Sequence, residues 1–421
     1  MNLQLKISEI SNLKSEISIT GSKSETNRLL LLQALYPNLV LENTSNSDDS
    51  EVMLEVLKNF QLSTSNIQLF DIHHAGTAMR FLTAFFAIQE GKEVVLTGSS
   101  RMKERPIRIL VEALNQLGAE ISYEEKDGFP PIKIKGKKLT KNKVSLPANV
   151  SSQYISALLL IAPKLENGLE LTLEGEITSV PYIKMTLALL NEIGIETSFK
   201  ENIIKVNQLQ TINSKQITVE SDWSSASYWY SIIALSEIGT EIQLSSYKKN
   251  SLQGDTVLAE IYRNFGVETD FCTNLMLLRK VENLKPDQSD NELAKQTLNL
   301  KLNNCPDIAQ TIAVTCFGLG IGCHLTGLHT LKIKETDRLE ALKNELTKLG
   351  AIISVTNDSL TLQPTEGINE NVCIATYQDH RMAMAFAPLA LKTSIHIENA
   401  EVVSKSYPTF WEDLKQVGFQ F

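Results

Sequence analysis

The sequence predicts a two-domain α/β protein in which one unit of helices and short strands is repeated six times. Three observations support this fold class: a recurring pattern of helix, glycine and strand, a length of 421 residues, and a composition typical of globular chains. At roughly 150 residues per domain, the length predicts two or three domains. Hydrophobic residues make up 43% and charged residues 21% of the chain, which excludes disordered and fibrous classes.

The recurring unit is clearest around Gly118. A helix expected to begin at Pro106 carries apolar residues at helical spacing, namely Ile107, Leu110, Val111, Leu114 and Leu117. A glycine directly after such a stripe is typical of a helix C-cap. Two strands, residues 120–123 and 131–134, then flank a polar turn. The same pattern returns at Gly194, Gly266, Gly350 and Gly418, and in a weaker form at Gln61.

The six anchors are spaced (418 − 61)/5, about 71 residues apart, so six copies tile the chain. The last copy ends almost at its glycine, and the strand-like residues 3–20 are expected to supply its missing hairpin. Both termini then belong to one domain, residues 1–20 and 221–421, and residues 21–220 form an inserted domain. We expect helices covered by sheets, three repeats per domain, and an active-site cleft between the domains.

Basic and hydroxyl residues gather where the predicted helices begin, and these ends favour anions because of their free N–H groups and dipole. Helix capping is the default interpretation of the serines, and ligand contacts are the alternative. Arg80 could bind an anion or brace its loop, and Asp307 could be a cap or a general base. One further helix is expected to begin at Pro408. The residues at these ends are Lys23, Ser24, Arg28, Gly76, Arg105, Ser151, Ser152, Gln153, Ser179, Asp307, Lys334, Glu335, Arg338, Arg381 and Lys405.

Several functional classes are excluded by missing patterns. The formal charge of −9 argues against bulk nucleic-acid binding, and no apolar stretch is long enough for a membrane span. Five cysteines without a CxxC pair and a start without a signal peptide indicate a cytoplasmic protein. The histidines form no HxxxH or HExxH motif, and the Walker, GxSxG and GxGxxG patterns are absent. The remaining interpretation is a cationic site for two small phosphorylated or carboxylated molecules, at which a metal is a poor fit.

Ten short sequence motifs along the whole chain match those of a known family: GSKSETNR, AGTAMR, RMKERP, SSQ, SVPY, DWSSASY, the Pro-Asp of 306–307, KETDRL, QDHRMAMAF and SKSYP. In this order they resemble the EPSP synthase family of enolpyruvyl transferases. The resemblance implies two inside-out α/β domains of three βαβαββ units each. It also implies transfer of the enolpyruvyl group of phosphoenolpyruvate to the 5-hydroxyl of shikimate 3-phosphate by a monomer without a cofactor.

The resemblance also assigns roles to residues. Asp307 matches the base, Glu335 the acid and base at the methylene carbon, and Lys23 a lysine that assists both steps. Shikimate 3-phosphate would be bound by Lys23, Ser24, Arg28, Ser151, Ser152, Ser179, Asp307, Thr330 and Lys334. Phosphoenolpyruvate would be bound by Lys23, Gly76, Arg105, Gln153, Arg338, Arg381 and Lys405.

Three positions depart from the family pattern. His74 replaces an asparagine, Phe81 replaces a proline, and Thr330 replaces an asparagine that contacts the shikimate phosphate. The first two put glyphosate sensitivity in question. One alternative is a UDP-N-acetylglucosamine enolpyruvyl transferase, but its reactive loop cysteine is missing because the first cysteine of this chain is Cys272. The other is a non-catalytic anion-binding paralogue, which should have lost Lys23, Asp307 or Glu335.

Overall fold

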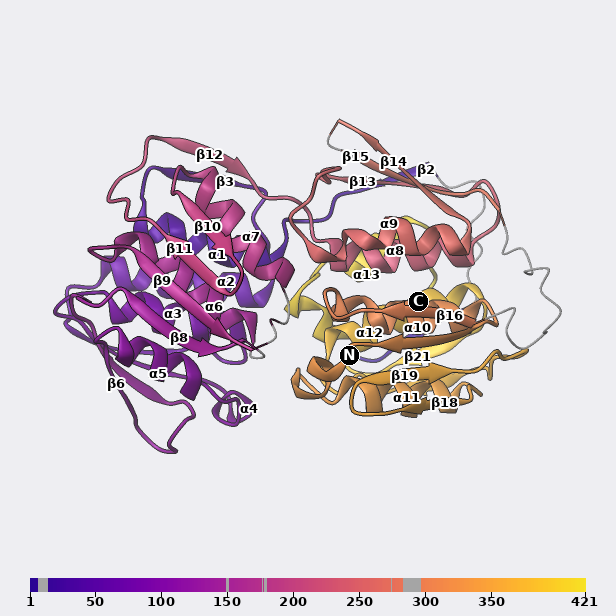
Figure 1. The fold of residues 1–421 in the computed structure, drawn as a ribbon. Helices are drawn as coiled ribbons and strands as arrows, with labels where there is room; N and C mark the ends of the chain where they lie inside the picture. The colour runs from indigo at the N-terminus through magenta and orange to yellow at the C-terminus, as the bar shows by residue number, and fades with distance from the viewer. Residues whose placement is uncertain (7–13, 149–150, 176, 178–179, 274, 283–296) are drawn as a thin grey trace. The chain divides into compact units, whose positions relative to one another are not determined.

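The computed structural model describes residues 1–6, 14–148, 151–175, 177, 180–273, 275–282 and 297–421 (Figure 1). The chain forms two compact units, which we call the terminal unit (Met1–Thr20 with Glu220–Phe421) and the inserted unit (Gly21–Val219). Glu220 belongs to the terminal unit, where its carboxylate accepts hydrogen bonds from Trp223 Nε1 at 2.9 Å and Lys248 N at 2.8 Å. None of the described helices combines the length and apolar character needed to span a membrane.

The inserted unit contains three sheets. Two of them have four strands, in the orders β4-β5-β7-β6 and β10-β11-β9-β8, and the third is the parallel pair β12-β3. The first copy runs β4 (Ile67–Asp71), α3 (Gly76–Ala87), β5 (Glu93–Thr97), α4 (Ser100–Lys103), α5 (Arg108–Gln116), β6 (Glu120–Tyr123), β7 (Ile132–Lys135). The second runs β8 (Lys143–Pro147), α6 (Ser152–Ile161), β9 (Leu169–Glu174), α7 (Val180–Glu192), β10 (Thr197–Lys200), β11 (Ile203–Val206). The third runs β12 (Lys215–Thr218), α1 (Lys23–Leu35), β3 (Leu39–Glu42), α2 (Asp48–Leu62).

The terminal unit also contains three sheets, in the orders β14-β15-β13-β2, β16-β17-β19-β18 and β1-β21-β20. The first copy runs β2 (Lys14–Ile17), α8 (Trp223–Leu235), β13 (Glu241–Ser245), η2 (Gly254–Val257), α9 (Leu258–Ile261), η3 (Tyr262–Phe265), β14 (Val267–Cys272), β15 (Leu275–Lys280). The second runs β16 (Thr297–Lys301), η5 (Pro306–Ile308), α10 (Ala309–Gly318), β17 (Gly322–Thr326), η6 (His329–Ile333), α11 (Arg338–Lys348), β18 (Ile353–Val355), β19 (Ser359–Leu362). The third runs β20 (Val372–Ile374), α12 (His380–Phe386), η7 (Ala387–Leu391), β21 (Ile395–Ile397), η8 (Ala400–Lys405), α13 (Phe410–Gln416), β1 (Leu3–Leu5).

The anchor glycines end their helices as predicted. Each takes a positive φ, which is the left-handed conformation that glycine adopts without a steric penalty at a helix C-cap. The values are +105° at Gly118, +93° at Gly194, +73° at Gly266, +102° at Gly350 and +104° at Gly418. The recurrence of glycine at the ends of these helices therefore has a backbone cause.

Three local predictions were wrong. The N-terminal residues do not form a hairpin in the last copy, because β1 pairs with β21 while β2 pairs with β13 of another sheet. The helix expected at Pro106 begins at Arg108, since Ile107 N donates to Gly128 O at 2.9 Å and Ile107 occupies the N-cap. The helix expected at Pro408 begins at Phe410, with Thr409 at its N-cap.

The helices form the interior of each unit. Every residue of α8 except Ser224 is buried, and Tyr154–Ile161 of α6 are buried without interruption. A helix that is apolar all round needs cover on every side. In the terminal unit, α8 contacts β13, β14 and β15, which lie over it in Figure 1.

One buried lysine lies at the end of this core. Lys280 has a side chain that is 2% exposed, and its Nζ donates to Ala234 O at 2.9 Å and Phe265 O at 2.6 Å, near the ends of α8 and η3. Carbonyls at helix ends favour a cation. Burial nevertheless lowers the pKa of Lys280 from its ordinary 10.5 to about 8.

This lysine predicts a pH-dependent stability. Between about pH 8 and pH 10.5 the unfolded chain keeps a proton that folded Lys280 has lost, so the free energy of unfolding should rise with pH. Since a shift of one pKa unit corresponds to 1.36 kcal/mol, the free energy of unfolding should rise by about 3 kcal/mol over this range. Lys280→Met should remove this rise in urea unfolding measured across that range, whereas the exposed-site control Lys301→Met should keep it. Parallel wild-type and Lys280→Met curves would contradict the prediction.

Candidate active site

Charged side chains of the terminal unit converge on Asp307. Asp307 lies in η5, where Cys305 rather than Asp307 occupies the N-cap. Arg338 Nη1 lies 3.0 Å and Lys334 Nζ 3.4 Å from Asp307 Oδ1. Arg381 Nη2 lies 3.3 Å from Oδ2. Burial acts to raise the pKa of Asp307, but the three cations outweigh it and hold the pKa far below its usual range. The carboxylate is therefore ionised.

Arg338 joins three carboxylates in this cluster. Its guanidinium also contacts Glu335 Oε2 at 2.7 Å and Asp379 Oδ2 at 2.6 Å, and its side chain is only 2% exposed. Burial would lower the pKa of Arg338, but Asp379, Glu335 and Asp307 reverse that effect and raise it. Asp337 caps α11 by accepting from Leu339 N and Glu340 N, each at 3.2 Å. Arg338 and Glu335 are therefore not needed as helix caps.

The remaining predicted residues of this unit lie at different distances from the cluster. Lys405 Nζ lies 3.8 Å from Glu335 Oε1, so Glu335 has a cation near each of its oxygens. Lys405 ends η8 and does not directly precede a helix. Thr330 lies in η6 with its Oγ1 buried, and no described residue forms a hydrogen bond with that atom. Thr330 thus lies on the segment that leads to Lys334.

The turn before Arg381 is strained. Tyr377 (φ 53°) and Gln378 (φ 55°) both lie in the left-handed region, which costs a non-glycine residue roughly 1–2 kcal/mol. The buried carboxylate of Glu345 accepts from Tyr377 Oη at 2.7 Å and Ala375 N at 3.1 Å. The turn leads to Asp379, whose Oδ1 accepts from Arg381 N at 2.9 Å. The hydrogen bonds to Glu345 therefore hold the strained segment that positions Asp379 and Arg381.

Removing one of these bonds should destabilise the terminal unit. Tyr377→Phe deletes a hydrogen bond to a buried carboxylate, for which we expect a loss of about 1.5–3 kcal/mol in the free energy of unfolding. Tyr123→Phe is the matched control, because the buried Tyr123 hydroxyl has no hydrogen-bond partner among the described residues. Chemical denaturation of both variants tests this. Equal unfolding free energies for the two would show that the Glu345 bond is not stabilising.

In the inserted unit, Lys23 and Arg28 lie on α1. Lys23 Nζ is 3.8 Å from Asp49 Oδ2. The buried Arg28 guanidinium donates to three neutral oxygens: Thr186 Oγ1 at 2.8 Å, Ser156 Oγ at 2.9 Å and the backbone oxygen of Ser24 at 2.7 Å. Burial lowers the pKa of Arg28 to about 10. Arg28 therefore stays cationic at neutral pH, with no carboxylate within ion-pair distance in the described part of the chain, and favours an anion.

A second cluster of the inserted unit surrounds Gly76, the first residue of α3. A Cβ atom at this position would lie 2.4 Å from Arg105 Nη1, so the Arg105 guanidinium lies directly against the Gly76 backbone. Gln153 Nε2 donates to Thr77 Oγ1 at 3.2 Å. Arg80 donates to Gly76 O at 2.9 Å and Pro106 O at 3.2 Å, so it acts as a brace. These contacts join α3, α6 and the loop before α5.

Of the predicted serines, Ser151 is a helix cap, whereas Ser24 lies inside α1. Ser151 caps α6 by accepting from Gln153 N at 3.4 Å, and Ser152 is buried beside it. Ser179 lies outside the described residues. Of the departures from the family pattern, His74 Nε2 lies 3.9 Å from Asp48 Oδ2, whereas Phe81 is fully buried with its ring centroid 5.4 Å from the Arg28 guanidinium carbon. Phe81 therefore packs against one of the proposed anion-binding arginines.

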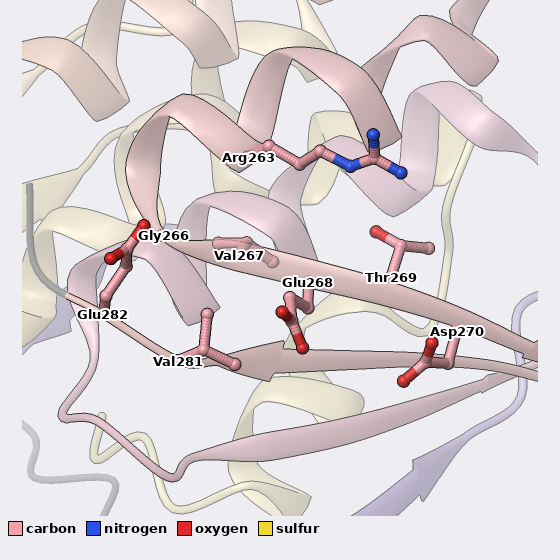
Figure 2. Close-up of a pocket in the computed structure, with 8 residues that line it drawn as sticks. All are labelled: Arg263, Gly266, Val267, Glu268, Thr269, Asp270, Val281 and Glu282. Carbon is pink, nitrogen blue, oxygen red and sulfur yellow. The ribbon is translucent and has the colours of Figure 1, made fainter.

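A hollow on the terminal unit has the opposite charge (Figure 2). Its lining residues are Arg263, Gly266, Val267, Glu268, Thr269, Asp270, Val281 and Glu282. Three carboxylates face one arginine there, which disfavours phosphorylated ligands. The cations around Asp307 and Gly76 are therefore the better candidates for an anion site.

Six helix-and-sheet copies in two units, with helices inside and cationic clusters at their ends, define the enolpyruvyl transferase class of α/β proteins. A solved structure described as EPSP synthase from Acinetobacter baumannii superposes with a TM-score of 0.79, covering 100% of this chain and 98% of that chain at 19% identity. The predicted fold class is confirmed.

Sequence comparisons define the family within that class. The family model described as EPSP synthase (3-phosphoshikimate 1-carboxyvinyltransferase) matches residues 7–414. A 3-phosphoshikimate 1-carboxyvinyltransferase from Bacteroides fragilis (strain YCH46) is 45% identical over 417 residues, covering 98% of this chain and 97% of the relative. A 3-phosphoshikimate 1-carboxyvinyltransferase from Shewanella pealeana is 35% identical over 440 residues, covering 98% of this chain and 99% of the relative. The chain belongs to the EPSP synthase family, and the predicted resemblance is confirmed.

Proposed function

We propose that this chain transfers the enolpyruvyl group of phosphoenolpyruvate to the 5-hydroxyl of shikimate 3-phosphate and releases phosphate. The hydroxyl oxygen adds to C2 of phosphoenolpyruvate while C3 gains a proton, and loss of that proton with phosphate then restores the double bond. The observation that carries the proposal is the pair of carboxylates, Asp307 and Glu335, that share one buried arginine. A base and an acid held side by side suit a reaction with two proton transfers.

In this proposal Asp307 removes the proton of the 5-hydroxyl. A carboxylate with such a low pKa is a weak base while Lys334 and Arg381 face it. The anionic groups of the substrates compete for these cations, and their binding therefore raises the pKa of Asp307 toward the value that catalysis needs. Glu335 delivers a proton to C3 and takes it back in the elimination step.

The cations divide between the two substrates. Phosphoenolpyruvate is held by Lys23, Gly76, Arg105, Gln153, Arg338, Arg381 and Lys405. Shikimate 3-phosphate is held by Lys23, Ser24, Arg28, Ser151, Ser152, Ser179, Thr330 and Lys334 together with Asp307. Arginine suits both groups because its planar fork matches carboxylate and phosphate oxygens. Cations around the departing phosphate also stabilise the charge that develops there.

The test is phosphate release from phosphoenolpyruvate without added metal. Release with shikimate 3-phosphate as acceptor supports the proposal. Release only with UDP-N-acetylglucosamine would assign the chain to the other enolpyruvyl transfer reaction. The absence of release with either acceptor would favour an anion-binding paralogue.

The proposal includes a monomer that works in the cytoplasm without a cofactor. The relatives' names support the transferase activity, and the monomer, the location and the lack of a cofactor are what the family resemblance implies. Light scattering during size-exclusion chromatography should give a mass near the 46.9 kDa of one chain. A mass near twice that value would contradict the monomer.

Gly76→Ala should separate substrate binding from folding. The three atoms nearest to the added methyl all belong to the flexible end of Arg105, so we expect the guanidinium to move while the helix remains intact. We expect the KM for phosphoenolpyruvate to rise about 10-fold or more, equivalent to one lost charged hydrogen bond, with little change in thermal unfolding. Gly367→Ala is the control, because a Cβ there meets no atom within 4 Å. An unchanged KM in Gly76→Ala would show that the position of Arg105 does not matter for phosphoenolpyruvate.

A further inference from the structure

A serine and a buried carboxylate that none of the assigned roles includes lie beside the Asp307 cluster. Ser224 is the second residue of α8, and Asp255 lies in η2. The Ser224 hydroxyl donates a hydrogen bond to Asp255 Oδ2. Arg381 Nη2 donates to Ser224 Oγ at 3.3 Å, and the same nitrogen lies 3.3 Å from Asp307 Oδ2. A continuous chain of contacts therefore leads from Asp255 to Asp307.

The direction of the bonds in this chain is fixed by chemistry. A guanidinium has donors only, so the Ser224 oxygen must present a lone pair to Arg381. The single hydroxyl hydrogen must then point elsewhere, and Asp255 accepts it. In its ionised form Asp255 offers only acceptors, and that form locks the hydroxyl in this orientation. The bond to Asp255 thus determines that Ser224 presents an oxygen lone pair, and not its hydrogen, to Arg381.

Keeping a carboxylate at this place is costly for the fold. Asp255 is 5% exposed, and no cation lies within ion-pair distance of it among the residues that the structure describes. Burial first, and the nearby Asp307 second, raise the pKa of Asp255 to about 7. A buried acid without a direct ion pair destabilises a protein, so Asp255 makes no evident gain in stability for the fold. Its contact with Ser224 points toward the active-site cluster.

We infer that Ser224 and Asp255 are positioning residues, which hold the Arg381 guanidinium where it contacts Asp307 and the anion that Arg381 binds. The identity of that anion as phosphoenolpyruvate rests on the proposed function. The placement of Arg381 against Asp307 does not, because it is a property of this chain alone. The two parts of the inference can therefore be tested separately.

Crystal structures of Ser224→Ala and Asp255→Ala test the placement directly. We expect the Arg381 guanidinium to leave its position near Asp307 Oδ2 in both variants. Ser224→Thr keeps a hydroxyl and should restore the contact. An Arg381 that stays in place in both alanine variants would overturn the inference, whether or not the protein has the proposed activity.

Kinetics test the consequence for the anion. We expect the KM for phosphoenolpyruvate to rise about 10- to 100-fold in Ser224→Ala and in Asp255→Ala, the range for a lost hydrogen bond to a charged group, with a smaller fall in kcat and recovery in Ser224→Thr. Ser227→Ala is the matched control. Its buried hydroxyl donates to Ser224 O at 2.6 Å on the same helix, so it should lose stability with an unchanged KM.

The outcomes separate the inference from the proposed function. Equal KM values in Ser224→Ala, Asp255→Ala and Ser227→Ala, with only their stabilities lowered, would reduce the pair to a structural contact between η2 and α8. A wild-type protein that releases no phosphate with shikimate 3-phosphate would overturn the proposed function. The crystal structures would in that case still decide the positioning of Arg381.

Discussion

Asp307→Ala is expected to lower kcat for phosphate release about 1,000-fold. The reason is the loss of a general base, which typically contributes between 100- and 10,000-fold. The change also leaves Arg338, Arg381 and Lys334 facing one another without the carboxylate between them. Their charges should still attract the anionic substrates, so the KM values should change far less than kcat. Steady-state assays with both substrates varied give the two parameters separately.

Asp307→Asn is the control that separates charge from shape. It keeps the size of the side chain but can neither take up a proton nor neutralise the cations, so kcat should fall as far as in Asp307→Ala. A variant with kcat within 10-fold of wild type would show that another group is the base, and Glu335→Gln would then be the next substitution to measure. Circular dichroism of each variant confirms that the loss is not one of folding.

The fold was predictable where its signals are local. A stripe of apolar residues and a glycine behind it are neighbours in the chain, and Gly118 and Gly350 adopt the expected left-handed conformation. The N-terminal strands show the limit of this reasoning. Leu3–Leu5 and Lys14–Ile17 are both strand-like, but their partners, β21 and β13, lie far away in the sequence and in different sheets. Strand pairing depends on those distant partners, which periodicity does not reveal.

The candidate site shows the same division. Short motifs such as KETDRL point to Glu335 and Arg338 as candidates because the motif residues adjoin one another in the chain. Asp255 carries no such signal, since it meets Ser224 across 31 positions and Arg381 only through that serine. Asp379 stands inside a recognised string, but its partnership with Arg338 spans 41 positions. Residues that act through another side chain emerge only when the fold is known.

Arg338→Met is expected to have the largest effect on stability. The substitution keeps an unbranched buried side chain but removes the charge that three carboxylates share. Asp307 and Glu335 retain Lys334, Arg381 and Lys405 as neighbours. Asp379 is fully buried, so it loses the guanidinium without access to water. Breaking a buried ion pair on one side costs about 3–5 kcal/mol, and we expect that loss in the free energy of unfolding, together with loss of phosphate release.

A double-mutant cycle tests the physical reason for this loss. Arg338→Met combined with Asp379→Asn removes the orphaned charge, so the double variant should be more stable than Arg338→Met alone, as a cycle of directly contacting residues predicts. Arg101→Met breaks an exposed pair with Glu104 and should cost no more than about 1 kcal/mol. If the changes in the free energy of unfolding caused by the two buried substitutions were additive, the ion pair between Asp379 and Arg338 would not contribute to stability. Arg338 would then serve substrate binding, and the three carboxylates would owe their stability to the other cations.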